Sequence, residues 1–222
     1  MAQALSTKQL CAVPLFPLPN VVLFPCAVLP LHIFEERYKA MTADALVGDR
    51  LIAMALLRPG WQRNYYEHPS IEPVVCVGEI LSHELLADGT YNFLLRGVIR
   101  AKIVEEVGHQ RYRQGQLQPL EQTASWADVL AGLRHQMGEL LAGGVLAGAP
   151  GAMQIQRLLQ TSMPTPDIAD LLAFTFLDDV GLKQSLLGDT NVERRIERLL
   201  AALAQQPPCP APGASPHQPS WN

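Results

Sequence analysis

The chain has 222 residues, of which 48% are hydrophobic and 17% charged, and its formal net charge at pH 7 is −4. A chain of this length and apolar content can bury one large core or two modest ones, and its acidic balance argues against general attraction to nucleic-acid phosphates. No apolar run reaches the roughly 18 to 20 residues of a membrane span. The start MAQALSTKQL lacks the pattern of a secretory signal, so we expect a cytoplasmic protein with no membrane association.

Residues 10–122 are predicted to form a β-rich subdomain, because short apolar runs alternate there with proline and glycine. In the segment LFPLPNVVLFPCAV (15–28) the prolines punctuate short strands whose Val, Leu and Phe residues fill a core. One helix is expected after this segment, with Gly48 as its stop. Apolar residues recur on one face of that helix: Phe34, Tyr38, Met41 and Ala45.

A hairpin is predicted around Asp88-Gly89, a dipeptide suited to a two-residue turn with positive φ. Strands of mixed apolar and polar residues flank this dipeptide on both sides. Gly97 is expected to bend the chain before a further strand, VIRAKIVEEV.

Residues 123–204 are predicted to form a helical bundle. Its first helix is expected to begin at a capping box of Ser125 and Asp128, to bury an apolar face that includes Trp126, and to end at Gly143-Gly144. A second helix carries Ile155, Leu158 and Leu159. A third is expected to open with Thr165 as N-cap and Pro166 at its first position.

The last predicted helix starts at Thr190 or Asn191, where Glu193 can complete a cap. Its polar face is interpreted as a solvated surface with local ion pairs, and it carries Arg194, Arg195, Glu197 and Arg198. Residues 205–222, rich in Pro, Ala, Ser and Gly, are expected to be a flexible tail.

The sequence indicates no catalytic, metal or cofactor site. Phosphate-loop, dinucleotide-binding, nucleophile-elbow and H-E-x-x-H motifs are absent from it. The spacing of its cysteines fits neither zinc nor a disulfide framework, so buried free thiols are expected at Cys11, Cys26, Cys76 and Cys209. We therefore expect no enzyme activity.

The stretch WQRNYYEHP (61–69) contains three aromatic residues, Trp61, Tyr65 and Tyr66. Arg58 and Arg63 lie close to them in the sequence. Three interpretations remain open for Trp61, Tyr65 and Tyr66: a loop packed on the β-rich part, contact with an extended peptide, or stacking on unpaired RNA bases.

Several linked motifs, in order between about residues 12 and 204, carry a family resemblance. They are PLFPLPNVVLFPCAVLPLHIFEERYKAM, ALVGDRLIAMALL, VGEI, DGTYNFLLRGVIRAKI and ADLLAFTFLDDVGLKQSLLGDTNVERRIERLLAAL. Together they resemble the N-terminal substrate-binding domain of Lon proteases. The resemblance implies an α+β fold, with a PUA-like β pseudobarrel followed by a C-terminal α-helical bundle.

A complete Lon-type enzyme also has an ATPase module and a peptidase module with a Ser-Lys dyad, whereas this sequence ends in its proline-rich tail. The resemblance therefore implies a stand-alone, non-catalytic module that is related to proteolysis by its family. We expect it to bind exposed or unfolded segments of client proteins, with a protease or chaperone as a further class of partner.

Client binding is expected at apolar grooves and unpaired strand edges. The resemblance points to the start of the helix after PLHIF, which implicates Glu36 and Arg37; with Trp61, Tyr65 and Tyr66 they form the predicted binding residues. The alternative is a PUA-like RNA-binding module with basic residues on one strand face: Arg96, Arg100, Arg111 and Arg113. The acidic net charge disfavours nucleic acid.

Overall fold

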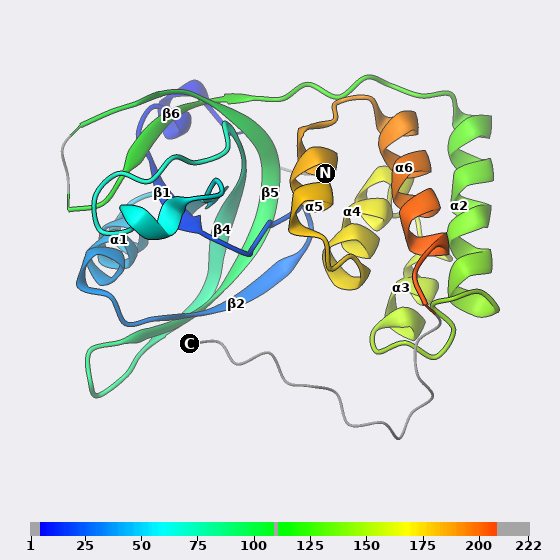
Figure 1. Cartoon of the computed structure of the whole chain (residues 1–222), viewed down its shortest axis with the longest axis horizontal. Helices are drawn as coiled ribbons and strands as arrows, with labels where there is room; N and C mark the ends of the chain where they lie inside the picture. Colours follow the sequence, from blue (N-terminus) through cyan, green and yellow to red (C-terminus); the bar gives the residue numbers. More distant parts are fainter. Residues whose placement is uncertain (1–4, 109–110, 208–222) are drawn as a thin grey trace.

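A computed structural model describes residues 5–108 and 111–207 of the chain. A β-barrel part and a helical part lie side by side, and a long connection after the last strand leads from one to the other (Figure 1). The α+β architecture expected from the resemblance is therefore present. Most of the tail predicted for residues 205–222 lies outside the described residues, which end at 207.

The barrel part contains all the strands of the described chain. Its elements in order are the 3-10 helix η1 (Thr7–Leu10), β1 (Val13–Leu18), β2 (Val28–Ile33), α1 (Glu36–Val47), β3 (Leu51–Leu56), the 3-10 helix η2 (Trp61–Arg63), β4 (Val74–Leu85), β5 (Tyr91–Glu106) and β6 (Gln114–Pro119). The strand order is β2-β5-β4-β3-β1-β6, and a further pairing of β5 with β6 closes five of the strands into a barrel. β1 and β3 are parallel, while β4 pairs antiparallel with β3 and β5.

Helix α1 packs its apolar face into the barrel core and ends at Gly48, as the sequence predicts. Tyr38, Met41 and Ala45 are buried there. Phe34 is an exception, because it precedes the first turn of the helix and is 60% exposed. The prediction that Phe34 belongs to this buried face is wrong.

The hairpin of β4 and β5 is present, but its loop is longer than the predicted two-residue turn. Leu85 pairs with Tyr91, so five residues connect the strands, and Gly89 adopts a φ of 79°. The Asp88 carboxylate accepts hydrogen bonds from the backbone and hydroxyl of Thr90 and stabilises the loop.

The sequence predicts a bend at Gly97 and a separate strand after it, but β5 runs through Gly97 as one element to Glu106. Its pairing with β4 shifts register between Gly97 and Ile99. A Cβ atom at this position would lie 2.0 Å from the carbonyl oxygen of Phe24. The Gly97 carbonyl accepts a hydrogen bond from the amide of Cys26, which follows Pro25 and has a φ of 66°. Glycine at 97 therefore lets the segment between β1 and β2 lie directly against β5.

The helical part contains α2 (Ala127–Ala142), α3 (Ala152–Leu158), α4 (Thr165–Phe176), α5 (Val180–Gly188) and α6 (Val192–Ala204). Helix α2 ends at Gly143 as predicted, but the expected cap is wrong. Trp126 occupies the N-cap position without a side-chain cap bond and is 80% exposed, so Ser125 does not cap the helix.

Helix α4 starts one residue earlier than predicted, and helix α5 was not predicted. Pro164 is the N-cap of α4, so Thr165 and Pro166 each lie one position further into the helix than expected. The sequence did not predict α5, which Asp179 caps through a bond from the amide of Leu182. The start of α6 is as expected, because the Asn191 side chain accepts from the amide of Arg194.

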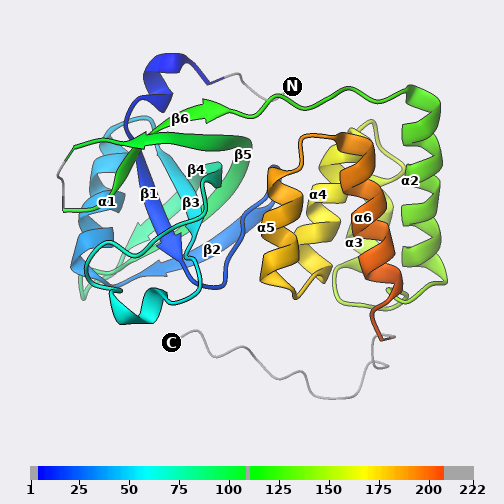
Figure 2. The ribbon, with the colours of Figure 1, turned by 45° about the horizontal axis from the view of Figure 1, so that its top comes forward.

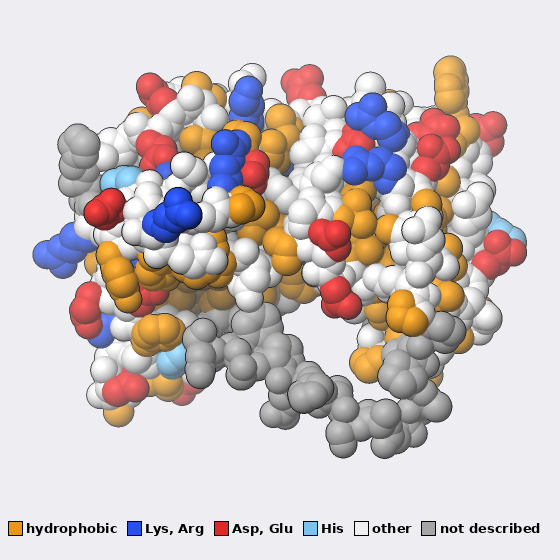
Figure 3. Space-filling model, in the orientation of Figure 1, with side chains coloured by type: hydrophobic (Ala, Val, Ile, Leu, Met, Phe, Trp, Pro, Cys, Tyr) orange, Lys and Arg blue, Asp and Glu red, His pale blue; other side chains and the backbone are white. Residues whose placement is uncertain are grey.

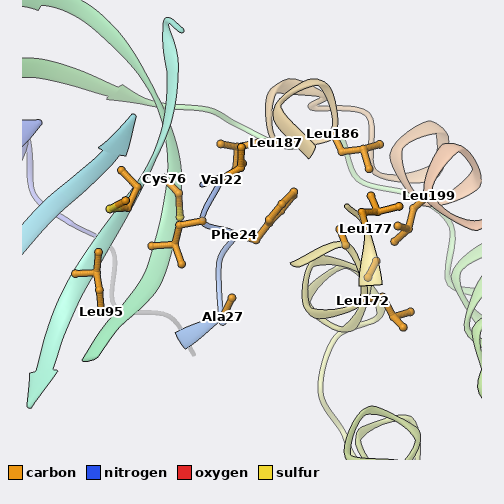
Figure 4. Close-up of a cluster of buried hydrophobic side chains, with 14 of the residues drawn as sticks. Val22, Phe24, Ala27, Cys76, Leu95, Leu172, Leu177, Leu186, Leu187 and Leu199 are labelled. Atoms are coloured by element: carbon orange, nitrogen blue, oxygen red, sulfur yellow. The ribbon is translucent and has the colours of Figure 1, made fainter. Parts of the chain in front are cut away.

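Barrel and helices share a hydrophobic core, and a second buried cluster lies within the barrel part alone. Figure 4 shows Phe24 pointing from the segment between β1 and β2 toward the helices, with Leu187 of α5 beside Val22. Phe24 is fully buried. The Gln184 side chain of α5 also donates to the backbone carbonyl of Val74, 2.8 Å away, which ties α5 to the start of β4.

A buried ionic cluster crosses the same junction. The Asp170 carboxylate of α4 accepts a hydrogen bond from Arg100 of β5, and their side chains are 3% and 1% exposed. The Arg195 Nε atom of α6 lies 3.7 Å from the same carboxylate, and its Nη2 donates to Gln122. Burial, followed by the neighbouring Arg100 charge, lowers the pKa of Arg195 to about 10.

This cluster corrects the interpretation of α6. Arg195 is 2% exposed, so it does not belong to a solvated face as predicted. Arg194 and Arg198 do form ion pairs, both with Asp189, at 2.7 and 3.2 Å. One of the residues on the polar stripe therefore packs inside the protein.

Candidate functional site

A cleft with a volume of about 540 Å³ lies on the barrel part. Its walls come from the first turn of α1, the connection between β3 and β4, and the chain from the end of β5 to the start of β6, together with part of β1. Its lining includes Arg37, Tyr38, Tyr65, Tyr66, Tyr112 and Arg113.

Arg37 is held by three tyrosine rings and one carboxylate. Its guanidinium carbon lies 4.5 Å from the ring centre of Tyr38, 4.7 Å from that of Tyr65 and 5.9 Å from that of Tyr66. Its Nε donates to Glu35 at 3.0 Å. Cation–π contacts of this kind are worth about 0.5 to 2 kcal/mol each. Because Arg37 makes three of them, it holds the surrounding tyrosine rings in position.

Glu35 also fixes the position of Tyr65. The Tyr65 hydroxyl donates to Glu35 Oε1 at 2.8 Å. Burial, followed by this hydrogen bond, raises the pKa of Tyr65, so the phenol keeps its proton and continues to donate. The β3–β4 connection is thereby attached to the N-terminus of α1.

Tyr38 of α1 also lines the cleft. The residue is 4% exposed, and its Oη has no hydrogen-bond partner among the described residues. Burial raises the pKa of Tyr38, so the hydroxyl is neutral and able to donate. The Tyr38 oxygen is itself buried, so it belongs to the wall of the cleft and not to its accessible surface.

The opposite wall of the cleft is also internally paired. Arg113 donates to both carboxylate oxygens of Glu106 and, at 2.7 Å, to the carbonyl oxygen of Pro69. Hydrogen bonding from Arg113 lowers the pKa of Glu106. The Tyr112 hydroxyl donates to Asp44 at 2.8 Å. Glu106 and Arg113 thus neutralise each other, while Glu67, His68 and Arg111 also line the cleft.

The structure brings together some, but not all, of the predicted binding residues. Arg37, Tyr65 and Tyr66 meet in the cleft, and Tyr66 is 87% exposed. Trp61 contacts Tyr65 edge-on, with ring centres 5.4 Å apart, but lines a second hollow of about 630 Å³ between the barrel and α5. Glu36 is not part of the cleft lining; its side chain is 88% exposed and pairs with Lys39 at 2.6 Å.

Tyr38 and Tyr112 were not among the predicted site residues. The helical spacing of Tyr38 does place it on a buried face, but periodicity gives no information on whether its hydroxyl finds a partner. Tyr112 precedes a strand and has no neighbouring motif in the sequence that marks it.

The expected strand edge is only partly available. Among the described strands, β2 pairs with β5 alone, so its other edge is open. Pro30 lies in the middle of β2 and has no N–H to offer a client strand. Side-chain contact in the cleft is therefore a better basis for recognition than pairing along β2.

The basic strand face proposed for RNA is not formed. Arg100 is buried, Arg96 pairs with Glu79 at 2.7 Å, and Arg113 pairs with Glu106. On the face shown in Figure 3, Lys and Arg side chains are interspersed with acidic and apolar ones, without a continuous basic area. The prediction of a common arginine face is wrong.

Three cysteines fall in the described part of the chain, and all three are free thiols. Cys76 is buried and Cys26 half-buried, whereas Cys11 is exposed, contrary to expectation. Cys209 lies outside the described residues. Across residues 5–108 and 111–207, the structure contains no group of three His, Cys, Asp or Glu residues able to hold a metal, and no helix long and apolar enough to cross a membrane.

Comparison with solved structures supports the fold. The N-terminal domain of the Lon protease of the Mycobacterium avium complex matches with a TM-score of 0.69 and 17% identity, over 88% of this chain and 99% of that one. A Lon N-terminal domain protein from Xanthomonas campestris matches with a TM-score of 0.57 and 21% identity, over 86% and 97% of the two chains.

Sequence comparison assigns the family. Lon protease 2 of Herpetosiphon aurantiacus is 27% identical, and the match covers 93% of this chain and 25% of that protein. The Lon protease of Dictyoglomus thermophilum is 22% identical, and the match covers 87% of this chain and 24% of that protein. The chain thus spans about a quarter of the length of these relatives. The model of the ATP-dependent protease La (LON) substrate-binding domain matches residues 12–205. The chain therefore belongs to the LON substrate-binding domain family.

Proposed function

We propose that this chain is a non-catalytic recognition module that binds exposed or unfolded segments of client proteins in the cleft between α1 and the β3–β4 connection. The family description, a substrate-binding domain, supports a role in recognition. The observation that carries the location is the cleft of about 540 Å³, in which a caged arginine orders several tyrosine rings.

The chemistry of the cleft suits broad selection of polypeptide segments. Tyrosine rings offer apolar contact area at low cost in conformational entropy, which suits contact with unfolded segments of varied sequence. Tyr66 supplies the accessible ring, while Arg37 and Glu35 keep Tyr65 in place without presenting a free charge. Binding is then expected to be weak and tolerant of sequence.

The other predicted residues extend this surface. Trp61 continues the aromatic row beyond Tyr65 toward the hollow beside α5, and Glu36 is an exposed residue of the first turn of α1, outside the cleft lining. We expect Trp61 to contact longer clients. We expect a smaller contribution from Glu36, because its carboxylate is solvated and already paired with Lys39.

The test measures binding of a fluorescently labelled, reduced and carboxymethylated protein that cannot fold, by anisotropy. Tyr66→Ala removes an exposed ring and should weaken binding at least about fivefold, which corresponds to about 1 kcal/mol. Val47→Ala is the matched control, because Val47 is 91% exposed at the far end of α1. Its affinity should match that of the unaltered protein.

Equal affinities of the Tyr66 and Val47 variants would contradict the proposed site. The function itself would be contradicted if the unaltered protein bound no unfolded protein but bound structured RNA with an affinity that fell steeply with salt. Glu36→Gln, measured in the same titration, determines the contribution of this exposed carboxylate.

A further inference from the structure

The connection between β3 and β4 is a long loop with little buried surface of its own. Its residues 58–70, called the strap from this point on, lie on the outside of the barrel beside α1, and Figure 2 draws them in cyan. Pro69 is the only residue of the strap that is buried. A segment with few buried contacts opens at a lower cost in free energy than the whole protein. The strap can therefore move while the barrel stays folded.

The base of the strap is fixed to the barrel at both ends. Leu57 and Ile71, which flank the strap, form an antiparallel bridge with each other. Near the second end, Arg113 donates a hydrogen bond to the carbonyl oxygen of Pro69 at 2.7 Å. Because these contacts hold the two ends in place, movement is confined to residues 59–68 between them.

Residues 59–68 are attached weakly to the rest of the described chain. Two hydrogen bonds join them to α1 and its N-cap: the Tyr65 hydroxyl donates to Glu35 at 2.8 Å, and Arg37 donates to the Tyr65 carbonyl at 3.4 Å. The backbone hydrogen bonds of residues 59–68 are turns within the strap itself. Since these turns do not depend on α1, residues 59–68 can leave it as one unit.

Buried polar atoms without hydrogen bonds lie where the strap meets α1. The Tyr38 hydroxyl is one of them. Burial raises the pKa of Tyr38, and the neighbouring Arg37, Tyr65 and Glu35 groups also act on it, which places this hydroxyl close to the strap. Arg37 Nη2 is also buried, and although it lies 3.0 Å from Glu35 Oε2 it forms no hydrogen bond. An unsatisfied buried polar group costs about 1 to 3 kcal/mol, and this cost opposes closure of the strap.

We propose that residues 59–68 form a lid, which opens away from α1 while the base of the strap stays in place. The bond from Tyr65 to Glu35 favours the closed state, and the unsatisfied Tyr38 hydroxyl opposes it. In the open state, water reaches the Tyr38 hydroxyl and the Arg37 guanidinium. The opening does not require a client. Its consequence, access of clients to Arg37 and Tyr38, rests on the function proposed above.

Proteolysis of the native protein by trypsin measures the opening. Arg63 is the cleavable site of the strap, because Pro59 follows Arg58 and blocks cleavage there. Arg100, buried in β5, is the internal reference for global unfolding. Mass spectrometry of the fragments gives the initial rate at each site, at low conversion and with rates proportional to trypsin concentration, so that the rates report open populations. Cleavage after Arg63 should be at least about tenfold faster than after Arg100.

Two variants that each remove one hydroxyl should change the opening in opposite directions. Tyr38→Phe removes the unsatisfied group, favours the closed strap and should slow cleavage after Arg63 at least about fivefold. Tyr65→Phe removes the bond that favours closure and should accelerate this cleavage at least about fivefold. Tyr112→Phe is the matched control, because the Tyr112 hydroxyl bonds to Asp44 and not to the strap. Its rate after Arg63 should equal that of the unaltered protein.

The lid is refuted if cleavage after Arg63 is no faster than cleavage after Arg100. It is also refuted if Tyr38→Phe fails to slow cleavage after Arg63, or if Tyr65→Phe fails to accelerate it. Changes by the same factor at Arg63 and Arg100 would assign the effect to global stability and would equally overturn the proposal. None of these measurements contains a client, so failure of the lid is distinguishable from failure of client recognition, which the anisotropy titration reports separately.

Discussion

Asparagine in place of Asp170 removes the carboxylate that lies between the buried guanidinium groups of Arg100 and Arg195. The pair with Arg100 is almost fully excluded from solvent, with side chains 1% and 3% exposed, so the remaining charge gains little from water. Removing one partner of a buried ion pair costs about 3 to 5 kcal/mol. Arg100 would keep its bond to the Leu187 carbonyl, which places the expected loss at the lower end of this range.

Urea unfolding followed by circular dichroism measures this loss. With a slope of about 2 kcal/mol per molar urea, a loss of about 3 kcal/mol moves the midpoint down by roughly 1.5 M. Glu121→Gln is the matched control, because it makes the same change of charge at an exposed site and should move the midpoint little. Replacing Arg100 by Met together with Asp170 by Leu should recover part of the stability, since no charge of the pair is then left unpaired.

The reasoning fails if Asp170→Asn costs less than about 1 kcal/mol, the usual range for an exposed pair. That result would mean that water reaches the cluster. Equal midpoints for the Asp170 and Glu121 variants would lead to the same conclusion.

The remaining predictions concern Gly97 and Asp189. Gly97→Ala should cost several kcal/mol of stability or prevent folding, because the added Cβ would meet the backbone of Phe24. Gly132→Ala, in open space on α2, should raise the stability by about 0.5 to 1 kcal/mol in the same unfolding experiment. Similar urea midpoints for the two variants would contradict the close approach at Gly97. Hydrogen bonding from Arg194 lowers the pKa of Asp189 in the folded protein. The ionised carboxylate therefore stabilises the fold at pH values above its ordinary pKa near 4, and this stabilisation is lost as the pH falls through the lowered pKa of the folded state. Asp189→Asn should therefore flatten the acid limb of the stability curve, and an unchanged limb would refute this assignment.

Local signals in the sequence were sufficient for much of the fold. Gly48 ends α1, Asn191 caps α6, and Asp88-Gly89 mark the β4–β5 hairpin, since each acts through atoms within a few residues of itself. Helix α5 escaped prediction because its apolar residues do not form a clear stripe, and its position depends on packing against the barrel.

The candidate site could be predicted only in part. The aromatic stretch from Trp61 to Tyr66 and the first turn of α1 were each recognised, but nothing local showed that Arg37 would lie among Tyr38, Tyr65 and Tyr66. The contact joins residues 28 positions apart, as the bond from Arg37 to the Tyr65 carbonyl illustrates. Glu36, one residue away, points outward because adjacent residues on a helix diverge by about 100°.

By itself, the sequence determined most of the element types, the order of the β-rich and helical parts, and the family, because these depend on local spacing and on linked motifs along the chain. The tertiary structure alone decided which polar residues are buried. Arg195 lies on the polar stripe of α6, yet it is excluded from water because Asp170 and Gln122, from distant segments, supply its partners. Periodicity identifies the faces of a helix, but the groups that meet each face are fixed only when the chain packs.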